Sequence, residues 1–207
     1  MPYGYVGDIS DKIKQSKKNN GVLSINEVAY LQADGHWGGS MDLIEEKDCS
    51  GETTLNFNDI KGDKYDVHFM QFIGVESGSN MYTEIRVSND GGSSWENSNY
   101  ERSVQYGSTS GTYGINANTA ADRFSILGYT SEGSSISHYV YLYNLNDSSK
   151  STYITHRAPP TNTWMYLGGG VYTVAEKIDA LQVLNSAGAS MTNGKVQLYG
   201  IKQIWVT

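Results

Sequence analysis

The stretch YDVHFMQFI at residues 65–73 decides the fold class, because its side chains fall into two alternating sets. One set is Tyr65, Val67, Phe69, Gln71 and Ile73, and the other is Asp66, His68, Met70 and Phe72. Successive side chains of a β-strand point to opposite faces of a sheet, so a period of two predicts a strand. The same period recurs at residues 82–87, 138–143 and 196–200, which indicates a β-rich protein.

Shorter segments rich in β-branched and aromatic residues complete the pattern. They predict further strands at 53–57, 101–106, 122–130, 151–156, 163–167, 171–175, 178–184 and 203–206. Turn-forming clusters at 76–80, 107–112, 131–135 and 144–151 separate them. Many short strands without intervening helical patterns predict an all-β fold, namely an antiparallel β-sandwich or jelly roll in one domain.

The composition excludes several other classes. Of the 207 residues, 16 are Tyr, 23 are Gly and only 18% are charged, whereas a coiled coil or helical bundle would need more Ala, Glu, Lys and Leu. The net charge of −7 argues against a nucleic-acid partner, because phosphate affinity comes from Lys and Arg. We expect no membrane insertion and no signal peptide, since the apolar runs are short and the start of the chain has no basic region. The single cysteine indicates folding in a reducing cytosol.

The first residues differ from the rest of the chain. Residues 1–22 carry a charge of +2, which leaves −9 for the remaining residues of a chain with −7. Their lysines are Lys12, Lys14, Lys17 and Lys18. With few apolar anchors, this segment is expected to be an extended N-terminal arm that docks on a partner; a frayed terminus is the alternative. A capping-box spacing at Ser24 and Glu27 predicts one short helix near 24–33, within a β-sandwich body over 23–207.

Residues 88–95, SNDGGSSW, resemble the Asp-box of sialidases. The four residues that define the motif are Ser88, Asp90, Gly92 and Trp95. The carboxylate of Asp90 is expected to accept hydrogen bonds from nearby backbone N–H groups, while the glycines adopt positive φ and Trp95 packs beneath the turn. We therefore expect a structural hairpin between strands near 81–88 and 95–105. Sialidases repeat the motif in each propeller blade, and this chain has it once, so it says little about glycosidase activity.

The tyrosines of segment 138–143 form a second candidate feature. Tyr139, Tyr141 and Tyr143 would project from one face of a strand, opposite His138, Val140 and Leu142. Tyrosine combines a large apolar area with a polar tip, which suits contact surfaces and sugar stacking. The row could belong to the core of a sandwich, to an oligomer interface or to a ligand-binding face. Trp37 and Trp164 are further candidates for sugar contact.

The remaining motifs predict structure and no chemistry. Residues 168–170, Gly-Gly-Gly, predict a tight turn or bulge, because no helix start follows them as in a dinucleotide-binding motif. The four histidines lack the spacing of a zinc site, and the acidic residues between 34 and 48 predict a solvated loop rather than a calcium site. Cys49 lies beside Asp48 and has no electropositive neighbour, so we assign it no nucleophilic role. The sequence thus predicts no catalytic residue, metal or cofactor.

The final part of the chain carries a family resemblance. Residues 178–201 read IDALQVLNSAGASMTNGKVQLYGI, which predicts two strands joined by a polar loop. They resemble the closing hairpin of small β-sandwich proteins of tailed bacteriophages, in which an Ile-x-x-Leu strand, a Ser/Gly loop and a Gly-x-x-x-Leu-Tyr-Gly-Ile strand recur. The segments MPY at 1–3 and NGVLS at 20–24 are similar to the N-terminal segments of phage tail and fibre proteins.

The resemblance implies a virion structural protein that is made in the host cytoplasm and is commonly an oligomer, with a homotrimer expected. We therefore expect a non-enzymatic, tail-associated fibre or adhesin-like component. It would dock on other virion proteins through its N-terminus, and a host-surface glycan is a further possible partner. A capsid decoration or head-fibre protein is one alternative, a carbohydrate-binding module is a second, and a glycosidase or depolymerase is a third.

Overall fold

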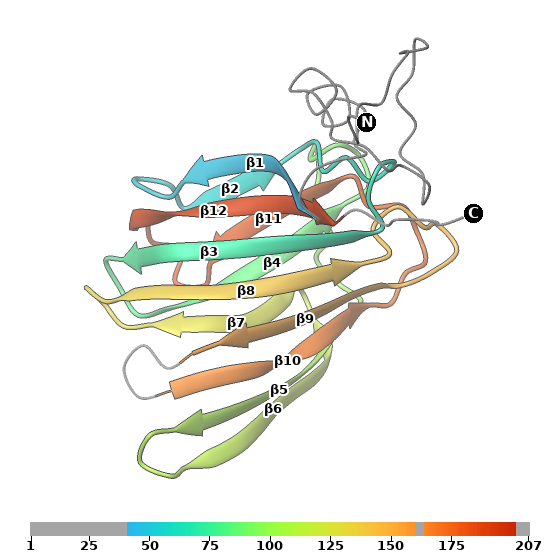
Figure 1. Ribbon diagram of the computed structural model, residues 1–207. Helices are drawn as coiled ribbons and strands as arrows, with labels where there is room; N and C mark the ends of the chain where they lie inside the picture. Colours follow the sequence, from blue (N-terminus) through green and yellow to red (C-terminus); the bar gives the residue numbers. More distant parts are fainter. Residues whose placement is uncertain (1–40, 160–163, 202–207) are drawn as a thin grey trace, which may run out of the picture. The chain divides into compact units, whose positions relative to one another are not determined.

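The computed structural model describes residues 41–159 and 164–201, and every regular element in these ranges is a β-strand (Figure 1). In chain order the strands are β1 (Met41–Asp48), β2 (Thr54–Phe57), β3 (Val67–Ser77), β4 (Met81–Ser88), β5 (Tyr100–Ser108), β6 (Tyr113–Ala121), β7 (Phe124–Thr130), β8 (Ser135–Tyr143), β9 (Thr152–Ala158), β10 (Trp164–Tyr172), β11 (Ala180–Asn185) and β12 (Met191–Ile201). The described part contains no helix long and apolar enough to cross a membrane.

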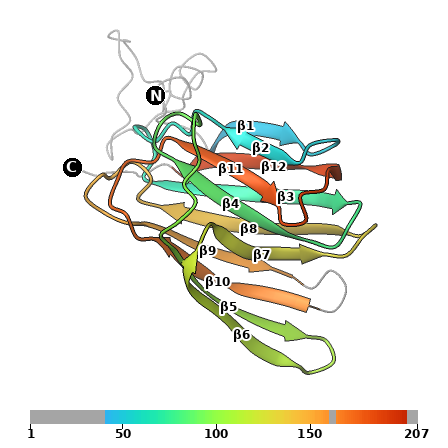
Figure 2. The same ribbon diagram turned by 180° about the vertical axis from the view of Figure 1, so that it is seen from behind.

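The strands form two antiparallel sheets of unequal size. The larger has eight strands in the order β1-β12-β3-β8-β9-β10-β5-β6, and the smaller has four in the order β2-β11-β4-β7. Figure 1 shows the larger sheet in front, and Figure 2 shows the smaller sheet from the opposite side. The expectation of an all-β fold with two antiparallel sheets, as in a sandwich, is confirmed.

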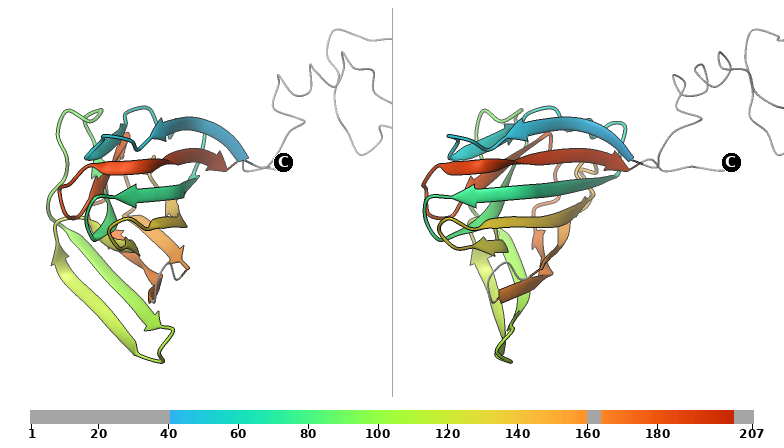
Figure 3. Two further views of the ribbon diagram at one scale, coloured as in Figure 1. Left: turned by 90° about the vertical axis from the view of Figure 1, so that its left-hand side faces the viewer. Right: turned by 60° about the vertical axis from the view of Figure 1, so that its left-hand side comes forward.

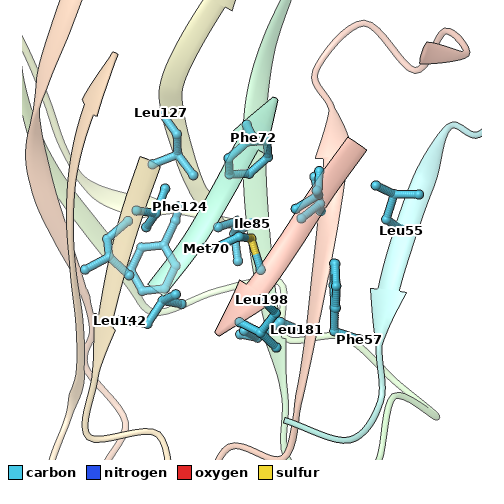
Figure 4. Close-up of a cluster of buried hydrophobic side chains, with 14 of the residues drawn as sticks. Leu55, Phe57, Met70, Phe72, Ile85, Phe124, Leu127, Leu142, Leu181 and Leu198 are labelled. Carbon is cyan, nitrogen blue, oxygen red and sulfur yellow. The ribbon is translucent and has the colours of Figure 1, made fainter. Parts of the chain in front are cut away.

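The core lies between the two sheets, as expected when each sheet buries one face. Apolar side chains from both sheets meet there, including Phe72 and Leu198 of the larger sheet and Ile85, Phe124 and Leu181 of the smaller one (Figure 4). All five are at most 1% exposed. In β8 the buried positions alternate with exposed or half-buried ones, in agreement with the period of two in its sequence.

Two buried histidines join the sheets by hydrogen bonds. His138 of β8 lies 2.8 Å from the hydroxyl oxygen of Thr83 on β4 and stacks on Phe72. His156 of β9 donates through Nδ1 to the carbonyl oxygen of Leu127 on β7, at 3.0 Å. Burial lowers the pKa of His138 to about 3 and that of His156 to about 4, so both rings are neutral near pH 7.

Both predicted hairpins are wrong, because their strands belong to different sheets. The Asp-box segment follows β4, which pairs with β11 and β7, and precedes β5, which pairs with β10 and β6. Likewise β11 lies in the smaller sheet and β12 in the larger one. Each connection therefore crosses between the sheets. A turn motif describes only its own backbone, and the pairing partner of each strand is decided by the packing of the sheets.

The tight turn or bulge predicted at residues 168–170 is also wrong, because the three glycines lie within the continuous strand β10 and pair in regular register on both sides. A Cβ atom on Gly168 would lie 2.4 Å from the carbonyl oxygen of Ser103 on the neighbouring strand β5. Gly170 faces the ring of Phe124 from β7, at a would-be Cβ distance of 3.0 Å. Glycine is therefore present here for the close approach of neighbouring groups, and no chain reversal occurs.

Two strands were absent from the predicted set, and several predictions lie outside the described residues. The acidic segment after residue 40 forms β1 rather than a solvated loop, and it pairs with β12 along Met41–Asp48. Strand β6 occupies residues 113–121, where no strand was expected. The N-terminal arm of residues 1–22, the helix near 24–33 and the strand at 203–206 lie outside the described ranges.

Candidate functional site

Two aromatic surfaces are the candidate functional sites of the described body. The first, which we call the aromatic cleft, is a depression of about 380 Å³. It is lined by Tyr82, Tyr106, Asn116, Ile126, Tyr129, Trp164 and Tyr166. The second, which we call the outer aromatic face, lies on the side of the larger sheet that points away from the core. It comprises Phe69, Tyr139, Tyr141, Tyr143, Tyr153 and Tyr199.

The unequal size of the sheets creates the aromatic cleft. Strand β7 is the edge of the smaller sheet, and beyond it β10, β5 and β6 continue the larger one. The hairpin of β5 and β6, coloured green, diverges from the other strands (Figure 3). The inward-facing side chains of β5 and β10 are therefore left partly uncovered, and aromatic rings from β4 and β7 approach them from the other side.

The rings of the cleft contact one another in a connected set. The ring of Tyr82 lies 5.1 Å from that of Tyr129 and 5.8 Å from that of Tyr166, with the second pair edge to face. The ring of Tyr106 lies 5.6 Å from that of Trp164. Aromatic pairs at these separations stabilise each other by about 0.5–1.5 kcal/mol beyond their buried area, so the walls of the cleft are held in place without a ligand.

A glycine on β6 sets the position of one ring. The ring of Tyr106 lies so close to Gly114 that a Cβ atom there would be 2.3 Å from the Tyr106 hydroxyl oxygen. Gly114 and Tyr106 are direct cross-strand partners. Any larger residue at 114 would push the tyrosine ring into the cleft. The side-chain direction of Tyr106 therefore depends on a residue whose role the sequence does not reveal.

The floor of the cleft includes a strained backbone position. Ile126 has φ of +63°, a conformation that is a clear outlier for a β-branched residue. It lies in a bulge of β7, where the pairing with β4 shifts between Thr83 and Ile85. Backbone strain of this kind costs on the order of 1–3 kcal/mol and is concentrated at functional sites, where a bulge redirects a side chain. The strained residue here is one that lines the cleft.

A polar cluster adjoins the cleft through Asn116. The Oδ1 atom of Asn116 accepts a hydrogen bond from Arg102 Nη2 at 3.0 Å. Next to Arg102, the buried carboxylate of Glu84 accepts from Arg123 Nη1 at 3.0 Å. Burial raises the pKa of Glu84, and Arg123 opposes that shift. The Arg123 guanidinium also binds Asp122 and lowers its pKa. The Nε atom of Arg102 is buried and makes no hydrogen bond within the described part of the chain.

The two tyrosines of the cleft rim differ in environment. Burial and a hydrogen-bonding contact with Tyr82 raise the pKa of Tyr166 well above its usual value, so its hydroxyl stays protonated. The Tyr106 hydroxyl and the Trp164 indole N–H have no hydrogen-bond partner among the described residues. These groups and the amide nitrogen of Asn116 belong to side chains that line the cleft.

The outer aromatic face spans several strands of the larger sheet. Tyr199, Phe69, Tyr141 and Thr155 lie side by side in register on β12, β3, β8 and β9. The ring of Phe69 lies 4.9 Å from that of Tyr141 and 6.1 Å from that of Tyr199. Tyr143 pairs across strands with the exposed Tyr153. The exposed Leu43 continues the row of Tyr199, and the exposed Arg157 lies opposite Tyr139 on the same face.

The structure separates residues that the sequence grouped as contact candidates. Tyr139, Tyr141 and Tyr143 lie on the outer face, each half-buried against neighbouring rings, whereas Trp164 lines the cleft on the inward side. Trp37 and the lysines at positions 12, 14, 17 and 18 lie outside the described residues. Sequence reasoning missed Tyr82, Tyr106, Tyr129 and Tyr166. Their only signal was the high tyrosine content, since they come from four strands with no shared spacing.

The Asp-box segment forms a compact turn away from both surfaces. Asp90 accepts hydrogen bonds from the backbone N–H of Ser94 at 2.9 Å and from the Ser94 hydroxyl at 2.7 Å, which lower its pKa to about 2. The Ser88 hydroxyl accepts from the N–H of Gly92, which has φ of +83°. The half-buried Trp95 lies against Gly92. The role of these residues is to hold the crossing between the sheets.

Cys49 and His68 are two further titratable residues that lie buried in the body. Cys49 is fully buried, and burial together with Asp48 raises the pKa of its thiol to about 12. His68 binds the carbonyl oxygen of Ile60 at 2.8 Å, and burial lowers its pKa. In residues 41–159 and 164–201, no group of three or more His, Cys, Asp or Glu side chains is placed to hold a metal ion.

Comparisons with protein families, with curated proteins and with solved structures found no match.

Proposed function

We propose that the chain is a non-enzymatic structural component of a bacteriophage particle, a tail-associated fibre or adhesin-like protein that assembles with copies of itself. Residues 1–22 would dock on another virion protein, and the β-sandwich would be presented to the exterior. The resemblance of residues 178–201 to phage β-sandwich proteins supports the viral assignment. A decoration or head-fibre protein of the capsid remains the second candidate within the same class.

The outer aromatic face is the observation that carries this proposal. Six aromatic rings cover adjacent strands, with the exposed Leu43 beyond Tyr199 and with Arg157 and the exposed Leu167 beyond Tyr139. Soluble monomers rarely expose a contiguous apolar surface of this kind, and larger ones mark interaction sites. Tyrosine and phenylalanine are also enriched in protein interfaces. Self-association through this face, with a homotrimer as the expected state, would cover it.

The charge distribution is compatible with docking through the N-terminus. Residues 1–22 carry +2 and the rest of the chain −9, so an arm of opposite sign to the body would be steered to an acidic site on a partner. Surface charge of this kind acts mainly on association rate and orientation. Affinity would come from apolar contacts made on docking.

Particle composition tests the proposal. Mass spectrometry of purified particles should detect the chain, and deletion of residues 1–22 should remove it from the particles while the truncated body stays soluble. Copies counted against the major capsid protein would separate the two locations, because a tail component is present in few copies and a decoration protein in hundreds. Normal incorporation of the truncated body would contradict docking through the arm, and absence of the intact chain from particles would contradict the virion assignment.

A further inference from the structure

We propose that the aromatic cleft is a binding site for a pyranose glycan, with the rings of Trp164 and Tyr106 as the stacking surface and Asn116 as the hydroxyl-binding group. This inference deepens the proposed attachment function, because it names the chemical class that the exposed sandwich would bind. It concerns a surface different from the outer aromatic face.

The cleft differs from the other depressions of the body in its aromatic side chains. Three other depressions of the body have similar volumes, between about 340 and 430 Å³. Two of them have no aromatic side chain in their walls, and the third, on the outer face, has Phe69, Phe72, His138 and Tyr139. The cleft has five aromatic rings around a volume of about 380 Å³. This volume lies within the range of about 300–1,000 Å³ that is typical of small-molecule sites. One face of a pyranose ring presents C–H groups that stack on aromatic rings.

The cleft also has hydrogen-bonding groups on the side chains that line it. A sugar needs donors and acceptors beside the stacking surface to bind its hydroxyls. The cleft provides the Trp164 indole N–H, the Tyr106 hydroxyl and the amide of Asn116. Because Arg102 holds Oδ1 of Asn116 at 3.0 Å, the amide orientation is fixed and its nitrogen remains a donor. An apolar ligand would leave these groups unpaired, at a cost of about 1–3 kcal/mol for each buried group.

Two features that line or shape the cleft lower the stability of the folded protein. The positive φ of Ile126 is unfavourable, and the bulge that contains it interrupts the pairing of β7 with β4. A regular β7 would pair without interruption and would change the side chains presented at this edge. Gly114, which makes room for the Tyr106 ring, weakens the edge strand β6. Both features position groups that line the cleft.

Saturation-transfer-difference NMR of the full chain tests the inference. The probes are maltotriose, mannotriose, chitotriose and the acidic sugar 3′-sialyllactose, each titrated to millimolar concentration. We expect saturable binding of at least one of them, with the strongest transfer to ring C–H protons. The variant Trp164→Ala should weaken the apparent affinity at least about tenfold. The matched control Tyr141→Ala, which removes an aromatic ring from the outer face, should leave it unchanged.

A second variant distinguishes a loss of binding from a loss of the fold. Trp164 packs partly against the core, whereas Asn116 lies on the edge strand β6. Asn116→Asp keeps the acceptor for Arg102 and removes the amide donor, so it should keep the melting temperature and still weaken binding. Absence of saturable binding for all four sugars would overturn the inference, and so would equal binding by the wild type and both cleft variants. Either result, obtained with a chain that is present in particles, would leave the proposed virion function standing and reject only the glycan site.

Discussion

The aromatic cleft and the outer aromatic face are built from the same residue type, but their surroundings differ. The cleft is concave, includes the strained Ile126, and continues into the polar cluster of Asn116, Arg102 and Glu84. The outer face is regular in register, and its charged neighbour is Arg157, which lies opposite Tyr139. Tyrosine content alone therefore does not determine what a surface binds. Shape and polar neighbours suggest a small polar ligand for the cleft and a protein surface for the outer face.

The largest expected effect is a loss of stability in acid that begins on the cleft side. The pKa of His156 is about 4 in the folded protein and near 6.5 when unfolded, so the unfolded chain binds the proton more readily. The stabilisation is complete above pH 6.5 and is lost as the pH falls towards 4, by roughly 3 kcal/mol at about 1.4 kcal/mol per pKa unit. Urea unfolding at several pH values measures this free energy.

The acid sensitivity should differ between the strands of the aromatic cleft and those of the outer aromatic face. His156 binds the carbonyl oxygen of Leu127, next to Ile126 on β7, and no buried histidine contacts the rings of the outer face through a hydrogen bond in the described body. Hydrogen exchange should therefore rise first in β7 and β4, the strands bound by His156 and His138, as the pH falls from 6.5. The variant His156→Gln, which keeps a donor and does not titrate, should reduce the pH dependence by the share of His156, while His138, whose pKa is also lowered, keeps its own share. An unchanged slope in this variant would show that the acid sensitivity has another origin.

Gly168→Ala should have the next largest effect, because β10 supports both surfaces. Its Cβ would lie 2.4 Å from the Ser103 carbonyl oxygen and 2.7 Å from the Val104 Cα, both backbone atoms that cannot move alone. We expect a loss of roughly 3 kcal/mol in the free energy of unfolding. The matched control is Gly78→Ala, where the nearest atom is 3.9 Å away. Equal stability of the two variants would contradict the close packing of β10 against β5.

A smaller difference in stability is expected between two substitutions that test for backbone strain in the cleft. Ile126 and Ile44 both pack partly buried against the core, but only Ile126 has positive φ. Asparagine tolerates that conformation, so Ile126→Asn should cost less stability than Ile44→Asn, by about 1 kcal/mol. Thermal or urea unfolding of the two variants gives the difference directly. A larger loss at 126 than at 44 would mean that the bulge is held by its apolar contacts and stores no strain.

The sequence predicted local structure well and pairing poorly. The alternation at 138–143 identified which side chains of β8 face the core, because a period of two is a property of the strand itself. The Asp-box was recognised as a turn, but it joins two sheets, and no local signal reveals that. Strand β6 was missed because its apolar residues, Tyr113 and Ile115, are exposed rather than buried. The cleft could not be predicted, since its rings come from four strands brought together by the unequal width of the sheets.

Light scattering of the intact chain and of Tyr141→Lys tests the assignment of the two surfaces most directly. A lysine in the middle of the outer aromatic face would place a charge in the proposed interface, while the side chain at 141 lies outside the core. We expect the wild type to have three times the chain mass of 22.8 kDa and the variant to have the mass of one chain, with its fold intact. A wild type with the mass of one chain, or a variant that stays assembled, would contradict self-association through this face.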